Sequence, residues 1–377
     1  GGAGELTSAL ATLDRQWELT SRKSKGPTAG IAGWTKLILE PKEEEQTESS
    51  YDYSPSGSSG YTAAMDQVAV AQAKMNQQEE FVYLLEPPTS PSLILFFLGG
   101  AGLGQFPHIA YSQLLSRISR RLNAAIITAP YPLSLDHFEL SKTSGEALRR
   151  ASVQCEEKGG YSPDLPKFYL GHSLGSKLLA IQLAASGVRD AQGIGFMSYN
   201  NFGFSNTISM VKEFADDLNQ GDNGAGNSAG AGAGMGAGMN GIDLDQILDF
   251  AGQAVNMMGF EFNPSPETMD RIVEMKYDGE LQKKTRLFMF DNDDLDSGKG
   301  FIKACENAGT SGPAVVELEG KHLSPVFLKL GIDDLEVPDE ARQYVDEASR
   351  GFQSASFGDE DKMNGAVNAV CDWIMGK

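Results

Sequence analysis

The stretch FYLGHSLGSKLLAIQLAA, residues 168–185, decides the fold. Its first residues form a short apolar run typical of a buried strand, and its last residues are apolar at helical spacing. Between these runs, Ser173 has Gly171 and Gly175 two positions away on either side. In a strand–turn–helix context this spacing is typical of a nucleophile elbow, where a Cβ at either glycine would clash with neighbouring backbone. An ordinary structural turn is the alternative interpretation.

Strand-like and helical segments alternate on both sides of this corner. Strands are expected in GWTKLILEP (33–41), EEFVYLLEP (79–87), SLILFFLGG (92–100), AAIITAP (124–130), KFYLG (167–171), GIGFMSYN (193–200), TRLFMF (285–290) and AVVELEG (314–320). Helices are expected at 108–123, 140–155 and 174–185. Near-continuous apolar strands alternating with helices predict an α/β fold, with a mostly parallel sheet covered by helices on both faces. Ligands of such sheets bind beyond the carboxyl ends of the strands, where the motif residues lie.

The chain is expected to form an N-terminal extension, residues 1–33, and one α/β domain, residues 34–377. This domain is divided into a core at 91–325, an insertion at 203–262, an acidic insertion at 324–362 and a C-terminal helix at 363–376. The first insertion contains GDNGAGNSAGAGAGMGAGMNG (221–241) and then an apolar helix. Glycine loses much entropy on ordering, so this insertion is expected to be mobile. It is interpreted either as a lid over an apolar pocket or as a loop without a role.

Composition excludes several function classes. The chain has 51 acidic and 31 basic residues and a net charge of −20. This balance opposes binding to nucleic acid and gives no electrostatic attraction to anionic lipid. No apolar run is long enough for a transmembrane segment, although peripheral association with a membrane or a protein complex stays open. Cys155, Cys305 and Cys371 match no disulfide framework or metal motif, which favours a reducing compartment. Neither a metal nor an organic cofactor is expected.

A serine hydroxyl is a weak nucleophile without a base, and the chain has four histidines. His322, in ELEGKHLSP (317–325), follows the last predicted strand and is expected to be the general base. His172 is adjacent to Ser173 in the sequence and cannot easily reach back to it. His108 opens a predicted helix, where capping or packing is expected.

An acid that orients the imidazole is expected after the penultimate strand. There RLFMFDNDDLDSG (286–298) offers four aspartates. Asp293 has the preferred spacing, Asp296 is the runner-up and Asp294 is the third choice. A solvated acidic turn or a cation site is the alternative interpretation of the cluster. The order of serine, acid and histidine along the chain differs from that in other serine hydrolase folds.

An oxyanion hole needs two backbone N–H donors. The amide of Leu174, directly after the serine, is one candidate. The second is expected from the loop GGAGLGQ (99–105), with Ala101 favoured and Gly100 second. A phosphate-binding loop is a weaker interpretation, because neither G-x-G-x-x-G nor a P-loop lysine is present. The candidates for lining the substrate pocket are His137, Asn200 and Asn201, although for His137 a structural role is the favoured interpretation.

Several further motifs follow one another along the chain. They are FLGGAGLGQFPHIAYSQLL (97–115), TAPYPLSLDHFEL (128–140), YLGHSLGSKL (169–178), MSYNNFGFSNTI (197–208), FNPSPETMDRIVEMKY (262–277) and FDNDDLD (290–296). With GKHLSP, they resemble the α/β-hydrolase superfamily over roughly residues 91–325, and more narrowly a plastid and cyanobacterial family called domain of unknown function 1350. The resemblance implies an α/β-hydrolase fold and a plastid location, in the stroma or at the thylakoid. The missing initiator Met agrees with a removed transit peptide or with an engineered end. The resemblance supplies no substrate.

The combined prediction is a serine ester hydrolase that acts on an acyl or lipid-like ester through Ser173, Asp293 and His322. Its expected partner is a small-molecule or lipid ester. The alternative is a non-catalytic interaction or scaffold subunit with the same fold, associated with a thylakoid complex. Acyl transfer by the same residues is a third interpretation.

Overall fold

The computed structural model describes residues 10–11, 14–15, 33–40, 80–187, 190–204, 261–329 and 356–377. Nearly all of the N-terminal extension, the Gly/Ala-rich stretch with its apolar helix, and most of the acidic insertion lie outside these residues. The expectations for those segments, including the lid, therefore stay predictions.

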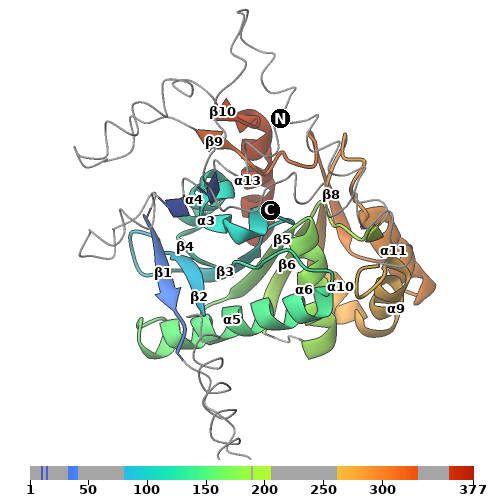
Figure 1. The fold of residues 1–377 in the computed structure, drawn as a ribbon, viewed down its shortest axis with the longest axis horizontal. Helices are drawn as coiled ribbons and strands as arrows, with labels where there is room; N and C mark the ends of the chain where they lie inside the picture. Colours follow the sequence, from blue (N-terminus) through green and yellow to red (C-terminus); the bar gives the residue numbers. More distant parts are fainter. Residues whose placement is uncertain are drawn as a thin grey trace, which may run out of the picture.

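An eight-stranded sheet forms the centre of the molecule, in the order β1-β2-β4-β3-β5-β6-β7-β8 (Figure 1). Its strands are β1 Trp34–Ile38, β2 Phe81–Leu85, β3 Leu93–Leu98, β4 Ala124–Thr128, β5 Lys167–His172, β6 Ala191–Met197, β7 Thr285–Phe290 and β8 Ala314–Leu318. Strand β2 is antiparallel to β1 and β4, and all other neighbouring strands are parallel. This mostly parallel arrangement is the α/β-hydrolase fold, so the fold prediction is confirmed.

Helices cover both faces of the sheet. They are α3 Pro107–Ala110, α4 Ser112–Leu122, α5 His137–Glu157, α6 Leu174–Ser186, α9 Pro266–Lys276, α10 Gly279–Lys284, α11 Gly298–Asn307 and α13 Glu360–Ile374. Figure 1 shows α5 and α6 on one side of the sheet and α4 and α13 on the other. One apolar cluster joins the sheet to α5, α6, α9 and α11 through residues such as Leu178 and Phe301. A second joins it to α4 and α13 through Leu115 and Val370. Both faces are therefore buried, as near-continuous apolar strands require.

Two predicted helices differ from those observed. The helix expected at 108–123 is interrupted at Tyr111, which lies between α3 and α4 with φ −110° and ψ 13°. Helix α5 begins at His137 rather than at residue 140, because the Asp136 side chain accepts a hydrogen bond from the amide of Glu139 and caps the helix. Periodicity alone misses both features, since it registers neither a cap nor a break made by tertiary contacts.

Two further observations concern the state of the cysteines and the length of the helices. Cys155, Cys305 and Cys371 are buried free thiols. Among the described residues, no helix combines the length and apolar character that crossing a bilayer demands.

Candidate active site

Ser173 occupies the turn between β5 and α6. Its φ of 55° and ψ of −122° lie outside the regions that residues with a side chain normally adopt. The turn is held by its backbone, because the Ser173 amide donates to the carbonyl of Met197 on β6 at 2.9 Å. A Cβ on Gly171 would lie 2.6 Å from backbone atoms of Ser176, so only glycine fits before this turn. This is the strained corner that the elbow motif predicts.

The structure brings the three predicted catalytic side chains into one hydrogen-bonded chain. Nε2 of His322 lies 2.9 Å from the Oγ of Ser173, and Nδ1 of His322 lies 3.0 Å from both carboxylate oxygens of Asp293. Ser173, Asp293 and His322 follow β5, β7 and β8, respectively, so the parallel sheet places them at one edge. A nucleophile, a base and an orienting acid are thus within mutual reach.

Burial makes the Asp293–His322 contact strongly electrostatic. The Asp293 side chain is 0% exposed and the His322 side chain 9% exposed. Burial raises the pKa of Asp293, but the hydrogen bond and charge of His322 outweigh it and hold this pKa below its usual value. Asp293 therefore stays an anion that can fix one tautomer of His322.

Asp296, the runner-up for the acid, has different surroundings. Its Oδ1 accepts a hydrogen bond from the amide of Gly298 at 2.5 Å, and its buried Oδ2 has no hydrogen-bond partner within the described part of the chain. Burial, reinforced by the charge of Asp293 and opposed by the Gly298 amide, raises the pKa of Asp296 to about 7. Asp294 is exposed. Of the three candidates, it is therefore Asp293 that hydrogen-bonds to the imidazole of His322.

The loop of residues 99–105, here called the oxyanion loop, lies beside the serine. The amide of Gly100 donates to the Tyr111 hydroxyl at 2.8 Å, so it is not free to bind an oxyanion, and this alternative donor is wrong. The carbonyl of Gly100 accepts from Gly104 at 2.6 Å. Within the described residues, no hydrogen bond uses the amide of Ala101 or that of Leu174. Both N–H groups are therefore available to donate to a bound oxyanion.

The three candidates for pocket lining occupy structural positions. His137 is 3% exposed and stacks on Phe262 with ring centroids 4.5 Å apart. The side-chain amide of Asn201 donates to the carbonyl of Pro266 and to Asp270 at 3.1 and 3.0 Å. The side-chain oxygen of Asn200 accepts from the Phe202 amide at 3.3 Å. Their observed contacts are with the protein itself, and a role toward substrate stays a prediction.

His108, which was expected to cap or pack, lies in a separate contact region. It is 1% exposed, and its ring stacks on Tyr83 with centroids 3.6 Å apart. Its Nε2 lies 2.9 Å from a carboxylate oxygen of Asp14. These contacts join the helix start at residue 107 to β2 and to a described piece of the N-terminal extension, which is a packing role.

Sequence reasoning missed a buried lysine on α6. Lys177 is one helical turn after Ser173, is 1% exposed and donates to the carbonyl of Pro264 at 3.2 Å. Burial lowers the pKa of this amine to about 8, against the opposing charges of Glu261 and Asp270. Its neighbours in the sequence give one signal, because a lysine inside a mostly apolar helix has little solvent to reach.

Two further groups behind Ser173 were also missed. His172 was set aside because it cannot reach the serine, and it instead contacts Tyr111 and the His322 backbone at 2.8 Å each. The helical spacing of residues 108–123 predicts a continuous helix through Tyr111. The adjacency of His172 to the nucleophile was the available sequence signal.

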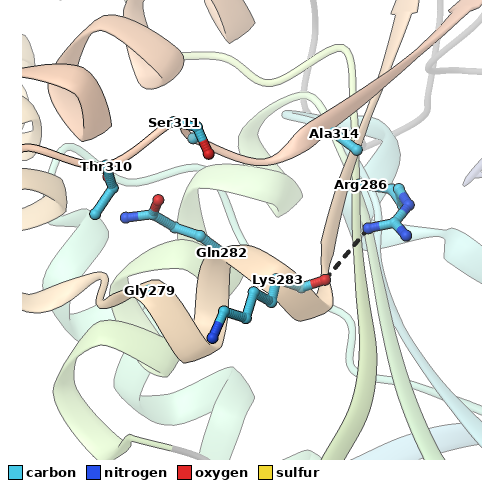
Figure 2. Close-up of a pocket in the computed structure, with 8 residues that line it drawn as sticks. Gly279, Gln282, Lys283, Arg286, Thr310, Ser311 and Ala314 are labelled. Carbon is cyan, nitrogen blue, oxygen red and sulfur yellow. Dashed lines mark hydrogen bonds between the residues drawn. The ribbon is translucent and has the colours of Figure 1, made fainter.

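A cavity of about 400 Å³ lies away from these residues, at the amino ends of β7 and β8 (Figure 2). Figure 2 shows the Gln282 side chain pointing toward Thr310 there. Of the two cations that line it, Lys283 forms an ion pair with Glu280 at 2.7 Å, and Arg286 donates to the backbone carbonyl of Lys283. Ligands of parallel sheets bind at the opposite edge, so this cavity is not the candidate site. The described residues contain no group of three or more His, Cys, Asp or Glu side chains suited to a metal ion.

Comparison with known proteins places the chain in a family. No curated protein matches it. Among solved structures it is similar to carboxyl esterase 2 from the fungus Tuber melanosporum, at 17% identity over 73% of this chain and 81% of that one, with a TM-score of 0.40. It is also similar to a butyrate-bound esterase from Thermogutta terrifontis, at 16% identity over 75% and 93% of the two chains and the same TM-score of 0.40. A fluorophosphonate-binding serine hydrolase from Staphylococcus aureus shows 13% identity over 65% and 86%, with a TM-score of 0.39.

These likenesses are too distant to carry an argument about activity. The family model described as "Protein of unknown function (DUF1350)" matches residues 76–333, which include all three residues of the hydrogen-bonded chain. The protein belongs to this family.

Proposed function

We propose that the protein is a serine ester hydrolase, with Ser173 as nucleophile, His322 as general base and Asp293 as the acid that orients it. The observation that carries the proposal is the unbroken contact from the serine Oγ through both ring nitrogens of His322 to Asp293, at 2.9 and 3.0 Å. A solvated acidic turn would not bury Asp293 completely against that imidazole. The contact favours catalysis over a structural turn.

The proposed oxyanion hole combines the amides of Leu174 and Ala101. Leu174 is the first residue of α6, where backbone N–H groups lack intrahelical acceptors and the helix dipole favours negative charge. Ala101 belongs to a loop that touches the serine, since a Cβ on Gly100 would lie only 3.2 Å from the Cβ of Ser173. Two such donors stabilise the charge that develops on a carbonyl oxygen under attack.

The proposed reaction has two halves. The Oγ of Ser173 attacks the ester carbonyl while Nε2 of His322 takes its proton, and the C–O bond to the alcohol breaks as His322 returns that proton to the alcohol oxygen. Water then attacks the acyl-serine, gives a proton to His322, and the acid leaves as Ser173 regains the proton. Asp293 keeps Nδ1 of His322 protonated and stabilises the imidazolium formed in both halves.

An acyl or lipid-like ester is the proposed substrate class. Two exposed apolar side chains, Leu133 and Phe138, follow β4 at the edge where Ser173 lies. The Phe204 and Phe262 rings pack edge to face, with centroids 5.5 Å apart. Phe262 also stacks on His137, the residue before Phe138. Apolar side chains at the ligand-binding edge of a sheet favour an apolar acyl group over a charged one.

A fluorophosphonate probe tests the proposal directly. It is expected to label the wild type and Ser176→Ala, but not Ser173→Ala. Ser176 is the matched control, because it is a buried serine in the first turn of α6, three residues after Ser173, and its hydroxyl donates to the carbonyl of Met197 at 3.2 Å. Labelling at Ser173 with turnover of p-nitrophenyl esters supports hydrolysis. Folded wild type that is not labelled would refute it and favour the non-catalytic interaction subunit.

A further inference from the structure

Behind Ser173 lies a chain of hydrogen bonds that the proposed reaction does not use. The amide of Gly100 donates to the Tyr111 hydroxyl at 2.8 Å, and this hydroxyl lies 2.8 Å from Nδ1 of His172. Nε2 of His172 lies 2.8 Å from the backbone carbonyl oxygen of His322. Tyr111 is 0% exposed and His172 1% exposed. The chain joins the oxyanion loop, the residue before the nucleophile and the backbone of the proposed base.

The direction of every hydrogen bond in this chain is fixed by chemistry. A carbonyl oxygen only accepts, so Nε2 of His172 carries a proton and donates it to His322. Burial, and after it the neighbouring His322, lowers the pKa of His172 to about 3, so the ring is neutral and Nδ1 is bare. The Tyr111 hydroxyl must then donate to Nδ1, which leaves its oxygen to accept from Gly100. Burial raises the pKa of Tyr111 and keeps this donor protonated.

The Tyr111 end of the chain orients the oxyanion loop. Because the Gly100 amide is bound by Tyr111, the next free donor along the loop is Ala101. The peptide before Gly100 is held from its other side, where the Tyr131 hydroxyl donates to the carbonyl of Gly99. A Cβ on Gly100 would lie 3.3 Å from both Nδ1 of His172 and the hydroxyl of Tyr111. The loop is thus packed directly against the hydroxyl and the ring that bind it.

We propose that Tyr111 and His172 are positioning residues that set the placement of the Ala101 donor relative to His322. The inference rests on the proposed function. An oxyanion hole works only when its donors lie where the charge develops, and a displacement of about 1 Å can cost ~10²-fold in rate. A neutral imidazole suits this task because one rigid ring offers an acceptor and a donor on different sides.

Tyr111→Phe, which removes only the hydroxyl, tests the oxyanion arm. Its kcat on a p-nitrophenyl ester is expected to fall by roughly 10- to 100-fold with KM little changed, because the lost interaction acts in the transition state. The control is Tyr277→Phe, which removes another buried hydroxyl, bonded to Thr285 at 2.6 Å, and is expected to keep wild-type kcat. An unchanged kcat in Tyr111→Phe, or an equal loss in both variants, overturns the proposal.

Two substitutions of His172 separate the two arms of the chain, which are the contact of its Nδ1 with Tyr111 and the contact of its Nε2 with the His322 carbonyl. Asn places an acceptor near the position of Nδ1 and keeps the partner of Tyr111, whereas Gln reaches the position of Nε2 and can keep the donor to His322. His172→Asn is therefore expected to retain tight binding of a boronic acid, which forms a tetrahedral anion on the serine, and to change the pH profile of kcat/KM. His172→Gln is expected to weaken the boronic acid by about 10-fold or more at unchanged ester KM. Identical behaviour of the two variants in both measurements contradicts the division into arms.

Nitrogen-15 NMR of the imidazole reads the network without relying on activity. The wild type and Ser173→Ala are both expected to show a neutral His172 with its proton on Nε2 from pH 5 to pH 9. A ring that titrates near pH 6.5, or a proton on Nδ1, overturns the proposal whatever the activity. If the expected spectrum is found but the wild type neither binds fluorophosphonate nor cleaves esters, the proposed function fails. In that case the network is structural and the positioning role fails with it.

Discussion

Gly175 lies against the backbone of Leu98, with no room for a side chain between them. A Cβ on Gly175 would be 2.1 Å from the carbonyl oxygen of Leu98 and 2.5 Å from that of Gly99. The first turn of α6 therefore meets the end of β3 backbone to backbone. This close approach places the amide of Leu174 beside the oxyanion loop, so the second glycine of the motif serves the geometry of the site.

Gly175→Ala is expected to destabilise the protein. Backbone atoms cannot move aside as a flexible side chain can, so overpacking should cost about 1–3 kcal/mol or more in the free energy of unfolding. Gly365→Ala is the control, because a Cβ there meets nothing within 4 Å in the interior of α13. It should gain roughly 0.5–1 kcal/mol. Urea denaturation of both variants measures this, and wild-type stability in Gly175→Ala would contradict the contact.

The acid of the proposed triad is tested by comparing Asp293→Asn with Asp296→Asn. Loss of the carboxylate on Nδ1 of His322 leaves the wrong tautomer, and kcat should fall by ~10⁴ on the precedent of serine proteases. Asp296→Asn should keep kcat within a few-fold, because the hydrogen bonds of the His322 ring go to Asp293 and Ser173 and not to Asp296. Ester hydrolysis at pH 7.5 measures both. A large loss in Asp296→Asn alone would exchange the two roles.

Asp296 should also affect stability in a pH-dependent way. Its folded-state pKa of about 7 lies above the ordinary 3.8, so the folded protein binds the extra proton. The stabilisation is full below pH 3.8 and is lost as pH rises through 7. Asn cannot ionise, so Asp296→Asn does not lose this stability as pH rises. The melting temperature of the variant minus that of the wild type should therefore be larger at pH 8.5 than at pH 5. A difference that is independent of pH would show that Asp296 is not desolvated.

The parallel sheet explains why the sequence predicts so much of the site. Residues that follow β5, β7 and β8 must meet at one edge, so Ser173, Asp293 and His322 could be grouped from strand ends alone. Tyr111 could not be grouped with them, because its apolar neighbours continue a helical pattern and its hydroxyl's partners, Gly100 and His172, are distant in the sequence. The exclusion of Gly100 as a donor depends on that same hydroxyl. The sequence does not predict helices α9 and α11 as elements, although the motif at 262–277 covers all of α9.

His137→Phe is expected to make the stability of the protein less dependent on pH below neutrality. Burial, and then the charge of Lys177, lowers the pKa of His137 to about 3, below its ordinary 6.5. The unfolded chain therefore takes up the proton first, and stability present above pH 6.5 is lost as pH falls toward 3. Phenylalanine can keep the stack on Phe262 and cannot titrate. His172 shares the shift, so the dependence should shrink without vanishing.

Melting temperatures between pH 7 and pH 4.5 measure this effect. The loss of stability over that interval should be smaller in His137→Phe than in the wild type. Equal losses in the two proteins would mean that His137 protonates freely in the folded state, which its burial opposes.

Phe204 and Glu261 close the base of the insertion. The amides of Phe204 and Phe262 donate to the same carboxylate oxygen of Glu261, at 2.7 and 2.8 Å. The first of these hydrogen bonds joins the chain on the two sides of residues 205–260. Replacing residues 205–260 with a short Gly/Ser linker should therefore leave the melting temperature within a few degrees of wild type, since loop length alone contributes little to stability. Glu261→Ala in the shortened chain should lower it.

The shortened chain also decides between the two interpretations of the insertion. Fluorophosphonate labelling of Ser173 should persist, because Asp293 and His322, which complete its hydrogen-bonded chain, lie outside residues 205–260. If the insertion covers an apolar pocket, kcat/KM for long-chain p-nitrophenyl esters should fall relative to short ones, because apolar area that buries the acyl chain is lost. An unchanged ratio would show a loop without a role in acyl selection. Loss of labelling in a folded shortened chain would contradict a site built from the described residues alone.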